Sequence, residues 1–262
     1  LLKEWLDSWE VNQKGKEQGQ RFVEEFCKEF PATRDVTKQS LFEWCSLMMQ
    51  VRKLTKKTIS CRLSPCKMYW QHLQIKGYVD PDKNPFTNLR LTQKSKSKKN
   101  NSREEFSIDE INQLTKEIKN KSDPELYYLF QIAIYTGARI EEICKIKKSN
   151  VGKVSMKIVN SKTSAGIREV PIHKQLTGLI KELRKSPEEK YLISNLVPNK
   201  FGERSASIGK RFGRLKKGLG FSSTKVFHSI RKTVVTQLEQ AGVPESVTAD
   251  IVGHEKKTIT YG

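Results

Sequence analysis

The sequence has no apolar segment long enough to cross a lipid bilayer. Its most apolar stretch, residues 127–135, is less than half of the roughly 20 residues that a transmembrane helix needs. No basic amphipathic helix stands out, so we expect no membrane partner. A signal peptide and an initiator Met are also absent, because the chain opens with L-L-K-E-W-L-D-S-W, typical of the inside of a helix. We therefore expect a cytoplasmic protein and a sequence that is part of a longer chain.

Cysteine is scarce as well. The 5 cysteines are odd in number and include no C-x-x-C pair, so neither a disulfide framework nor a zinc site is indicated. We expect buried thiols in a reducing cytoplasm. The sequence also lacks a Walker-type phosphate loop and clustered carboxylates, so we predict neither a nucleotide cofactor nor a metal ion. The cysteines are Cys27, Cys45, Cys61, Cys66 and Cys144.

Acidic residues are few relative to basic ones. The chain has 49 Lys and Arg against 29 Asp and Glu, a net charge of +20 over 262 residues. Such a surface attracts a polyanion, and its affinity should depend strongly on salt. We expect a nucleic-acid partner, although charge alone does not exclude a basic protein without one.

A basic, polar segment divides the chain. Residues 91–103, L-T-Q-K-S-K-S-K-K-N-N-S-R, carry five basic groups and no acid, which is typical of an exposed linker. We predict one domain over residues 1–90 and a second over 104–262. The linker lysines are candidates for contact with DNA phosphates: Lys94, Lys96, Lys98 and Lys99.

The first domain has the periodicity of helices. Two sets of apolar residues recur at helical spacing, and each predicts a buried helix face. Pro65 should kink or split the second helix, and Gly77 should stop it. Lys56 and Lys57, at the start of that helix, could meet phosphates through their charge and the helix dipole. The two sets are Leu41, Trp44, Cys45 and Met48, and Ile59, Leu63, Cys66, Tyr69, Trp70 and Leu73.

The second domain should be mainly α with a small β-hairpin, an α+β fold. Ser107 and Glu110 form a capping box, and residues 126–135 predict a core helix. Residues 154–159 and 167–172 predict two strands joined by a short turn, N-S-K-T-S-A-G. Three or four helices should follow, with core positions at Leu176, Leu179, Ile180 and Leu183, at Ile208, Phe212 and Leu215, and at Ile230, Val234 and Leu238.

Three separated fragments carry the chemistry. T-G-A-R-I-E-E contains Arg139, H-S-I-R contains His228 and Arg231, and V-G-H ends at His254. Guanidinium groups bind phosphate oxygens in pairs, and imidazoles donate hydrogen bonds or move protons near neutral pH. The set therefore suits phosphodiester chemistry.

Local geometry can be predicted for these residues. Arg139 should open a helix that continues to Ile146, so its side chain would stand at a helix N-terminus, a natural anion site. Glu142, three residues later, should share its helix face. His228 and Arg231 should project together away from the core of their helix, towards one ligand.

The order and wording of these fragments resemble the tyrosine recombinases, the phage-type integrases. The resemblance covers residues 35–262, loosely at first and specifically from Arg139 onward. It implies that the first domain is a helical core-binding domain and that the two domains clamp duplex DNA. The segments L-T-K-K-T-I-S-C-R-L-S and N-P-F in the first domain resemble that domain's signature.

By this resemblance, Arg139 and Arg231 stabilise the transition-state charge on a scissile phosphate, and Glu142 braces the site. His228 and His254 bind the phosphate and assist proton transfer. Lys162, in K-T-S-A-G-I-R-E-V-P, is the general acid for the departing 5′-oxygen. A tyrosine nucleophile forms a 3′-phosphotyrosine, which conserves the bond energy without ATP or metal.

The nucleophile itself is expected to be missing. The family's tyrosine lies two to three helical turns' worth of residues beyond the histidine of the G-H box, whereas Tyr261 comes only seven residues after His254. We expect the tyrosine beyond Gly262, with Tyr261 as the alternative.

The resemblance implies a site-specific recombinase of a phage or other mobile element, acting at the bacterial nucleoid. Its partners would be double-stranded attachment sites, a homotetramer on two sites, and DNA-bending or directionality factors. A type IB topoisomerase-like enzyme and a non-catalytic DNA-binding protein are the alternatives.

Overall fold

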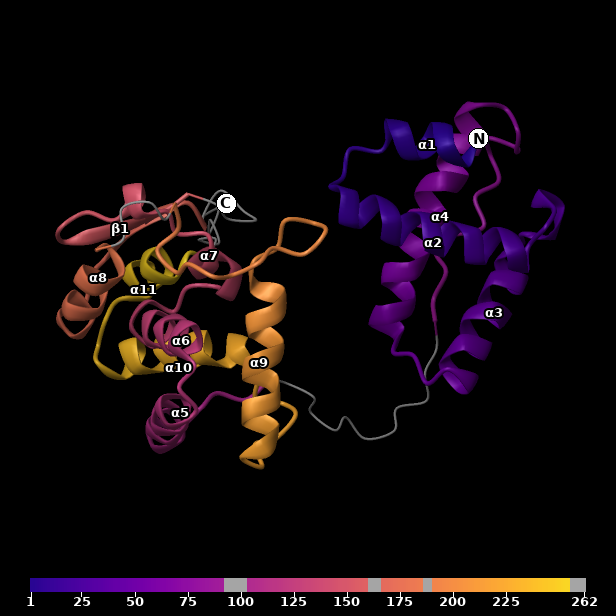
Figure 1. The fold of residues 1–262 in the computed structure, drawn as a ribbon. Helices are drawn as coiled ribbons and strands as arrows, with labels where there is room; N and C mark the ends of the chain where they lie inside the picture. Colours follow the sequence, from indigo (N-terminus) through magenta and orange to yellow (C-terminus); the bar gives the residue numbers. More distant parts are fainter. Residues whose placement is uncertain (92–102, 160–165, 186–189, 255–262) are drawn as a thin grey trace. The chain divides into compact units, whose positions relative to one another are not determined.

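The computed structural model describes residues 1–91, 103–159, 166–185 and 190–254. The chain forms two compact units, Leu1–Lys98 and Lys99–Gly262 (Figure 1). Each unit has its own hydrophobic core. The fold is mainly α, with one two-stranded antiparallel sheet among the described residues. No helix in the described part of the chain is both long and apolar enough to cross a membrane.

The first unit is a bundle of helices around aromatic side chains. Its α-helices and its 3₁₀ helix are α1 (Leu2–Ser8), α2 (Gln13–Glu29), η1 (Thr33–Asp35), α3 (Lys38–Val51) and α4 (Lys56–Ile75). Trp5, Phe26, Trp44 and Trp70 lie in the core, and α2 packs along α4. Both predicted apolar helix faces are buried, which confirms the periodicity.

Pro65 does not split its helix. Residues 56–75 form one continuous α4 with Pro65 buried inside it. A proline removes one backbone hydrogen bond and strains one turn. Contacts on both sides of Pro65 hold the helix together, since Ile59 and Leu63 before it and Tyr69 after it lie in the same core.

The expectation of buried thiols is wrong for two of the five cysteines. Cys45, Cys66 and Cys144 are buried, and burial raises the pKa of Cys45 to about 11. Cys27 and Cys61 are exposed. They lie outside the periodic apolar positions of α2 and α4, so the packing of these helices leaves them in solvent.

The second unit is built around the apolar helix α6 (Pro124–Thr136), which α5, α7, α9 and α10 contact (Figure 1). The capping box at Ser107 and Glu110 is present. The elements besides α6 are α5 (Ile108–Asn120), α7 (Ile140–Cys144), η2 (Lys148–Asn150), β1 (Ser155–Ile158), β2 (Arg168–Pro171), η4 (Lys174–Leu176), α8 (Thr177–Leu183), α9 (Ser205–Gly218), α10 (Phe227–Gln240) and α11 (Glu245–Val252).

The predicted hairpin is confirmed. Strands β1 and β2 pair antiparallel, with Met156 opposite Val170 and Ile158 opposite Arg168. Met156, Ile158 and Val170 point into the core. Strand β2 also lies against α11, so the sheet joins the C-terminal part of the described chain to the centre of the unit.

Helix α7 is shorter than predicted and ends at Cys144. The carbonyl of Ile146 accepts a hydrogen bond from the backbone N–H of Leu192 at 2.8 Å, and the N–H of Lys148 donates to the carbonyl of Lys190. This pairing with residues 190–192 takes the place of a further helical turn.

Candidate functional site

The turn between α6 and α7 places Arg139. Gly137 ends α6 with a φ of +61°, and a Cβ there would lie 2.9 Å from Val252 Cγ1. The left-handed backbone and the close approach of α11 both favour glycine. Arg139 then caps α7, with its side chain 32% exposed. The site therefore begins where α6, α7 and α11 meet.

Glu142 is the buried carboxylate of the site, with 4% of its surface exposed. Its Oε1 accepts from Arg139 Nη1 at 2.7 Å, and its Oε2 accepts from the Arg139 backbone N–H at 3.0 Å. The two side chains therefore lie on the same side of α7, as expected. A buried charge needs such partners, so Glu142 fixes both the backbone and the guanidinium of Arg139.

Arg168, which was not among the predicted site residues, is the second partner of Glu142. Its Nη2 lies 3.2 Å from Glu142 Oε2, and its Nε donates to the carbonyl of Ile251 at 2.7 Å. The side chain is 6% exposed, and burial is the main cause that lowers its pKa. The sequence did contain a signal for Arg168, because it is the basic residue that precedes V-P in the motif K-T-S-A-G-I-R-E-V-P.

Arg231 lies inside the protein, which corrects the prediction that it projects away from the core. Only 3% of its surface is exposed. Its guanidinium donates to the carbonyls of Gly137 at 3.1 Å and Gly253 at 3.0 Å, and also to that of Val252. The C-terminal carbonyls of α11 supply acceptors for the cation, which the periodicity of α10 could not show.

The electrostatics of Arg231 reflect its surroundings. Burial lowers its pKa to about 10, and the positive charges of Arg139 and Arg168 act in the same direction. The group still carries its charge at neutral pH. Added negative charge at this place would relieve that mutual repulsion.

The two histidines stand at the exposed edge of the arginines. Arg231 Nε donates to His254 Nε2 at 3.2 Å, so that imidazole carries its proton on Nδ1. Burial and the nearby Arg231 lower the pKa of both His228 and His254 below the ordinary value of 6.5. Both are therefore neutral at pH 7, and the Nδ1–H of His254 can donate a hydrogen bond.

We call Arg139, Arg168 and Arg231 with Glu142 the arginine cluster. Arg139 and Arg168 both pair with Glu142, and Arg231 is close enough to feel the charges of all three, so positive charge is in excess. Backbone carbonyls satisfy several donors, but they carry no net charge. The arrangement can therefore bind an anion, with planar donors suited to phosphate oxygens.

The remaining predicted residues belong to the first unit or fall outside the described residues. Lys56 and Lys57 are exposed at the first turn of α4, whose N-cap is Thr55. Lys162, Tyr261 and the four linker lysines, Lys94, Lys96, Lys98 and Lys99, fall outside the described residues. Within the described ranges, no group of three or more His, Cys, Asp or Glu side chains could hold a metal ion.

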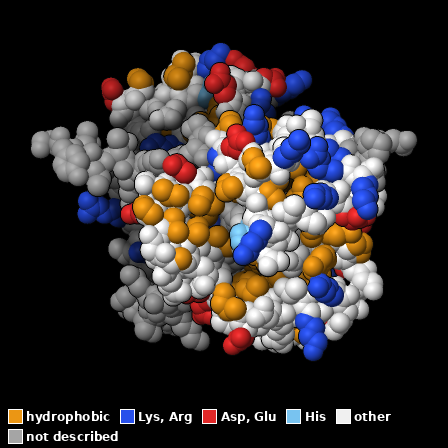
Figure 2. Space-filling view, turned by 90° about the vertical axis from the view of Figure 1, so that its left-hand side faces the viewer, with side chains coloured by type: hydrophobic (Ala, Val, Ile, Leu, Met, Phe, Trp, Pro, Cys, Tyr) orange, Lys and Arg blue, Asp and Glu red, His pale blue; other side chains and the backbone are white. Residues whose placement is uncertain are grey.

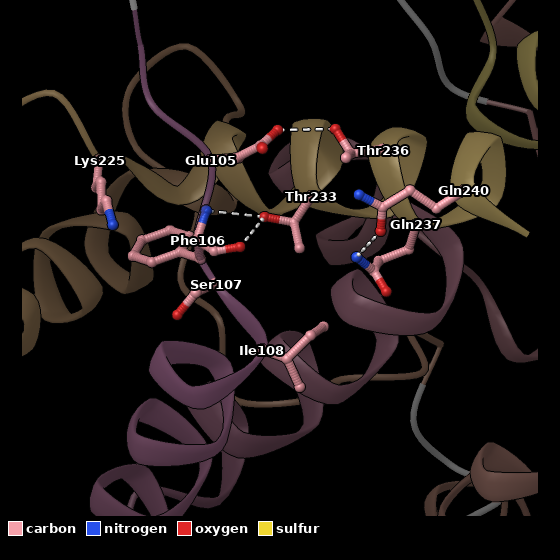
Figure 3. Close-up of a pocket in the computed structure, with 9 residues that line it drawn as sticks. All are labelled: Glu105, Phe106, Ser107, Ile108, Lys225, Thr233, Thr236, Gln237 and Gln240. Carbon is pink, nitrogen blue, oxygen red and sulfur yellow. Dashed lines mark hydrogen bonds between the residues drawn. The ribbon is translucent and has the colours of Figure 1, made fainter.

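A cavity of about 370 Å³ lies apart from the arginine cluster, between residues 105–108 and α10 (Figure 3). Its polar walls pair with each other. Thr236 donates to Glu105 at 2.7 Å, and the Thr233 hydroxyl accepts from the Phe106 N–H at 2.9 Å. These bonds attach the start of the second unit to α10, and the cavity contains none of the predicted site residues.

The chain matches a known family. The model of the phage integrase family matches residues 104–262 of this chain. A tyrosine recombinase XerC-like protein of Caldanaerobacter subterraneus is 24% identical, with 79% of this chain and 61% of that protein covered. A probable integrase/recombinase of Aquifex aeolicus is 22% identical, with coverages of 94% and 87%. The chain thus spans about three fifths of the first relative's length.

Solved structures share the fold. A lambda integrase tetramer bound to a Holliday junction has a TM-score of 0.73 at 17% identity, covering 98% of this chain and 78% of that one. The Tn1549 transposon integrase in complex with a circular intermediate DNA also has a TM-score of 0.73, at 20% identity, with coverages of 97% and 90%. At such identities the likeness shows the fold alone.

Proposed function

Because the chain belongs to the phage integrase family, we propose that it acts in site-specific recombination, cleaving and rejoining duplex DNA through a 3′-phosphotyrosine. One observation carries the proposal. Arg139 and Arg168 pair with the buried carboxylate of Glu142, and the buried Arg231 lies near them and bonds His254. His254 and His228 are both neutral at pH 7. This is an anion site with two imidazoles beside it.

The arginines have distinct roles in this mechanism. Arg139, the more exposed one, contacts the non-bridging oxygens of the scissile phosphate and stabilises the charge that grows in the transition state. Arg231 is buried, and the backbone carbonyls that accept its hydrogen bonds hold its guanidinium in place before DNA binds. Glu142 and Arg168 fix the orientation of Arg139 and are positioning residues.

Proton transfer falls to three side chains. His228 and His254, neutral at pH 7, hydrogen-bond the phosphate and assist proton transfer. Lys162 donates a proton to the departing 5′-oxygen. The nucleophile is a tyrosine beyond Gly262, with Tyr261 as the alternative.

The DNA would be held by basic surfaces on both units. We assign residues 1–90 to a core-binding domain, 91–103 to a linker and 104–262 to the catalytic domain. Lys56, Lys57 and the lysines of the linker bind phosphates. Lys and Arg side chains are spread over the face drawn in Figure 2, in keeping with the net charge of +20.

Helix α9 offers a further DNA-binding face. Lys210, Arg214 and Lys217 are exposed on one side of it, opposite the buried Ile208 and Phe212. The helix has no acidic residue. Sequence periodicity had identified only the buried side, although the basic positions were visible in the same pattern.

Recombination joins two sites, so we propose a homotetramer on two DNA sites. The tetramer named for the lambda integrase structure supports this. The transposon named for the Tn1549 integrase supports a mobile element as the source. We further propose a mobile genetic element as the source, DNA-bending or directionality factors as helpers, and action at the bacterial nucleoid.

A covalent adduct tests the proposal. Duplexes that the full-length protein enriches from a random pool would be nicked near the cleavage position, which traps the adduct. We expect a protein–DNA adduct that Arg139→Ala and Arg231→Ala abolish. Adduct mapping by mass spectrometry separates Tyr261 from a tyrosine beyond Gly262. DNA binding without an adduct would contradict catalysis and favour a non-catalytic DNA-binding protein.

A further inference from the structure

Helix α7 is too short to hold its own position. It has five residues, and isolated helices of this length are unstable because nucleation is costly. Arg139 is its N-cap, so the location of that guanidinium depends on what holds both ends of α7. Glu142 holds the first end, through the bonds described above.

Helix α9 also holds α7, through Glu141 in its first turn and Cys144 at its end, and the contact is reciprocal. Glu141 Oε1 accepts from the backbone N–H of Arg204 at 3.0 Å, and Oε2 accepts from that of Ser205 at 2.8 Å. These N–H groups open α9, whose own N-cap side chain makes no capping bond. Glu141 on α7 therefore caps α9 in place of a local residue.

Arg204 returns the contact. Its Nε donates to the carbonyl of Cys144 at 2.9 Å, and its Nη2 donates to that of Ile193 at 2.9 Å. The guanidinium also lies 3.9 Å from the centroid of the Tyr191 ring. Cys144 is the last residue of α7, so Arg204 places a positive charge at the C-terminal end of that helix.

The two helices thus exchange opposite charges at their ends. Figure 1 shows α7 beside the start of α9, in agreement with their contacts. Burial acts to raise the pKa of Glu141, but hydrogen bonds from Ser205 and Arg204 outweigh it and lower the pKa. The carboxylate is charged at neutral pH, and Lys145 lies 3.1 Å from it.

We propose that Glu141 and Arg204 are positioning residues for Arg139, which seat α7 on α9 and so set the affinity of the arginine cluster for phosphate. The inference rests on the proposed function. The consecutive Glu141 and Glu142 divide the work, because Glu142 orients the guanidinium of Arg139 and Glu141 fixes the helix that carries it. The same contacts connect α9, with its basic face, to the helix whose N-cap is Arg139.

The test uses the chain of 262 residues and inorganic phosphate as the probe. The Nε–Hε NMR signal of Arg139, assigned by its loss in Arg139→Lys, is followed at constant ionic strength. Glu141→Gln keeps the size of the side chain but leaves one of the two N–H groups without an acceptor. Arg204→Lys keeps the charge but cannot bridge two carbonyls. The matched control is Glu182→Gln, whose carboxylate is exposed and pairs with Lys185 on the surface.

We expect phosphate to shift the Arg139 signal, and each of the two variants to weaken that binding by about threefold to tenfold. Glu182→Gln should match the wild type. A purely structural role would lower the melting temperature and leave phosphate affinity unchanged, and that result would overturn the inference. If phosphate does not shift the signal in the wild type, the anion site of the proposed function fails as well. The two failures are therefore distinguishable.

Discussion

Arg168 shows how a single residue can connect the site to its scaffold. It bonds the buried Glu142 and the carbonyls of Ile251 and Gly166, so it joins β2, α7 and α11. Replacing it would leave a buried carboxylate with one guanidinium fewer. Because removal of one partner from a buried pair exposes the full desolvation cost of the other, such changes are severe.

We predict that Arg168→Met lowers the free energy of unfolding by about 3 kcal/mol. Urea denaturation at pH 7 would measure it. Arg184→Met is the matched control, because Arg184 is exposed and donates to the Gly152 carbonyl at 3.3 Å. Its effect should stay within about 0.5 kcal/mol. Equal losses for the two variants would contradict the bridging role.

The histidines give the site a pH dependence whose sign follows from their lowered pKa values. A histidine with a folded pKa below its unfolded pKa of about 6.5 favours folding in its neutral form. Its contribution is complete above that unfolded pKa and is lost as the pH falls through the folded pKa.

We therefore expect unfolding midpoints in urea to fall as the pH drops from 7 to 5, and part of this fall to vanish in the double variant His228→Gln/His254→Gln. Both chains are compared with themselves at pH 8, where these histidines are neutral. A double variant with the same pH slope as the wild type would show that these two residues do not cause it.

At the scale of the element, α9 contains a glycine that its fold does not require. A Cβ at Gly213 would meet nothing within 4 Å, and glycine inside a helix costs about 0.5–1 kcal/mol relative to alanine. Gly213 lies on the same side as Lys210, Arg214 and Lys217, the face assigned to DNA. Under the proposed function, close approach of a DNA backbone would explain why this position has no side chain.

Gly213→Ala should then have two opposite effects. We predict a gain in the free energy of unfolding of about 0.5–1 kcal/mol and a DNA affinity about threefold weaker or more. Thermal unfolding and fluorescence anisotropy with a labelled duplex measure the two. Gly178→Ala on α8, which also has open space around it, should keep wild-type affinity. Unchanged DNA binding by Gly213→Ala would remove α9 from the interface.

Elements with strong local signals could be predicted from the sequence. The capping box at Ser107, the apolar helix α6 and the hairpin follow from chemistry within a few residues. Pro65 and the end of α7 could not be predicted, because tertiary contacts decide them. Buried neighbours keep α4 whole, and the pairing of Ile146 with Leu192 ends α7.

Across the whole molecule, the site joins residues that are far apart in the sequence, and this limits what the sequence alone can tell. The motifs identified Arg139, Glu142, Arg231 and His254 as members of one set. They could not show that Arg231 is buried beneath the carbonyls of α11 or that Arg168 completes the cluster, because both depend on the contact between β2, α10 and α11.

The charge of the whole chain leads to a last prediction, on salt. Each phosphate contact by Lys or Arg contributes about 0.9 to the slope of log K against log salt concentration. If Lys56 and Lys57 bind phosphates at the start of α4, Lys56→Gln/Lys57→Gln should lower that slope by about 1.8.

Lys119→Gln/Lys121→Gln is the control, because it removes the same charge at the end of α5, where the helix dipole repels phosphate. Anisotropy titrations between about 50 and 200 mM salt give both slopes. An equal decrease for both pairs would mean that net charge, rather than contact at α4, draws the DNA.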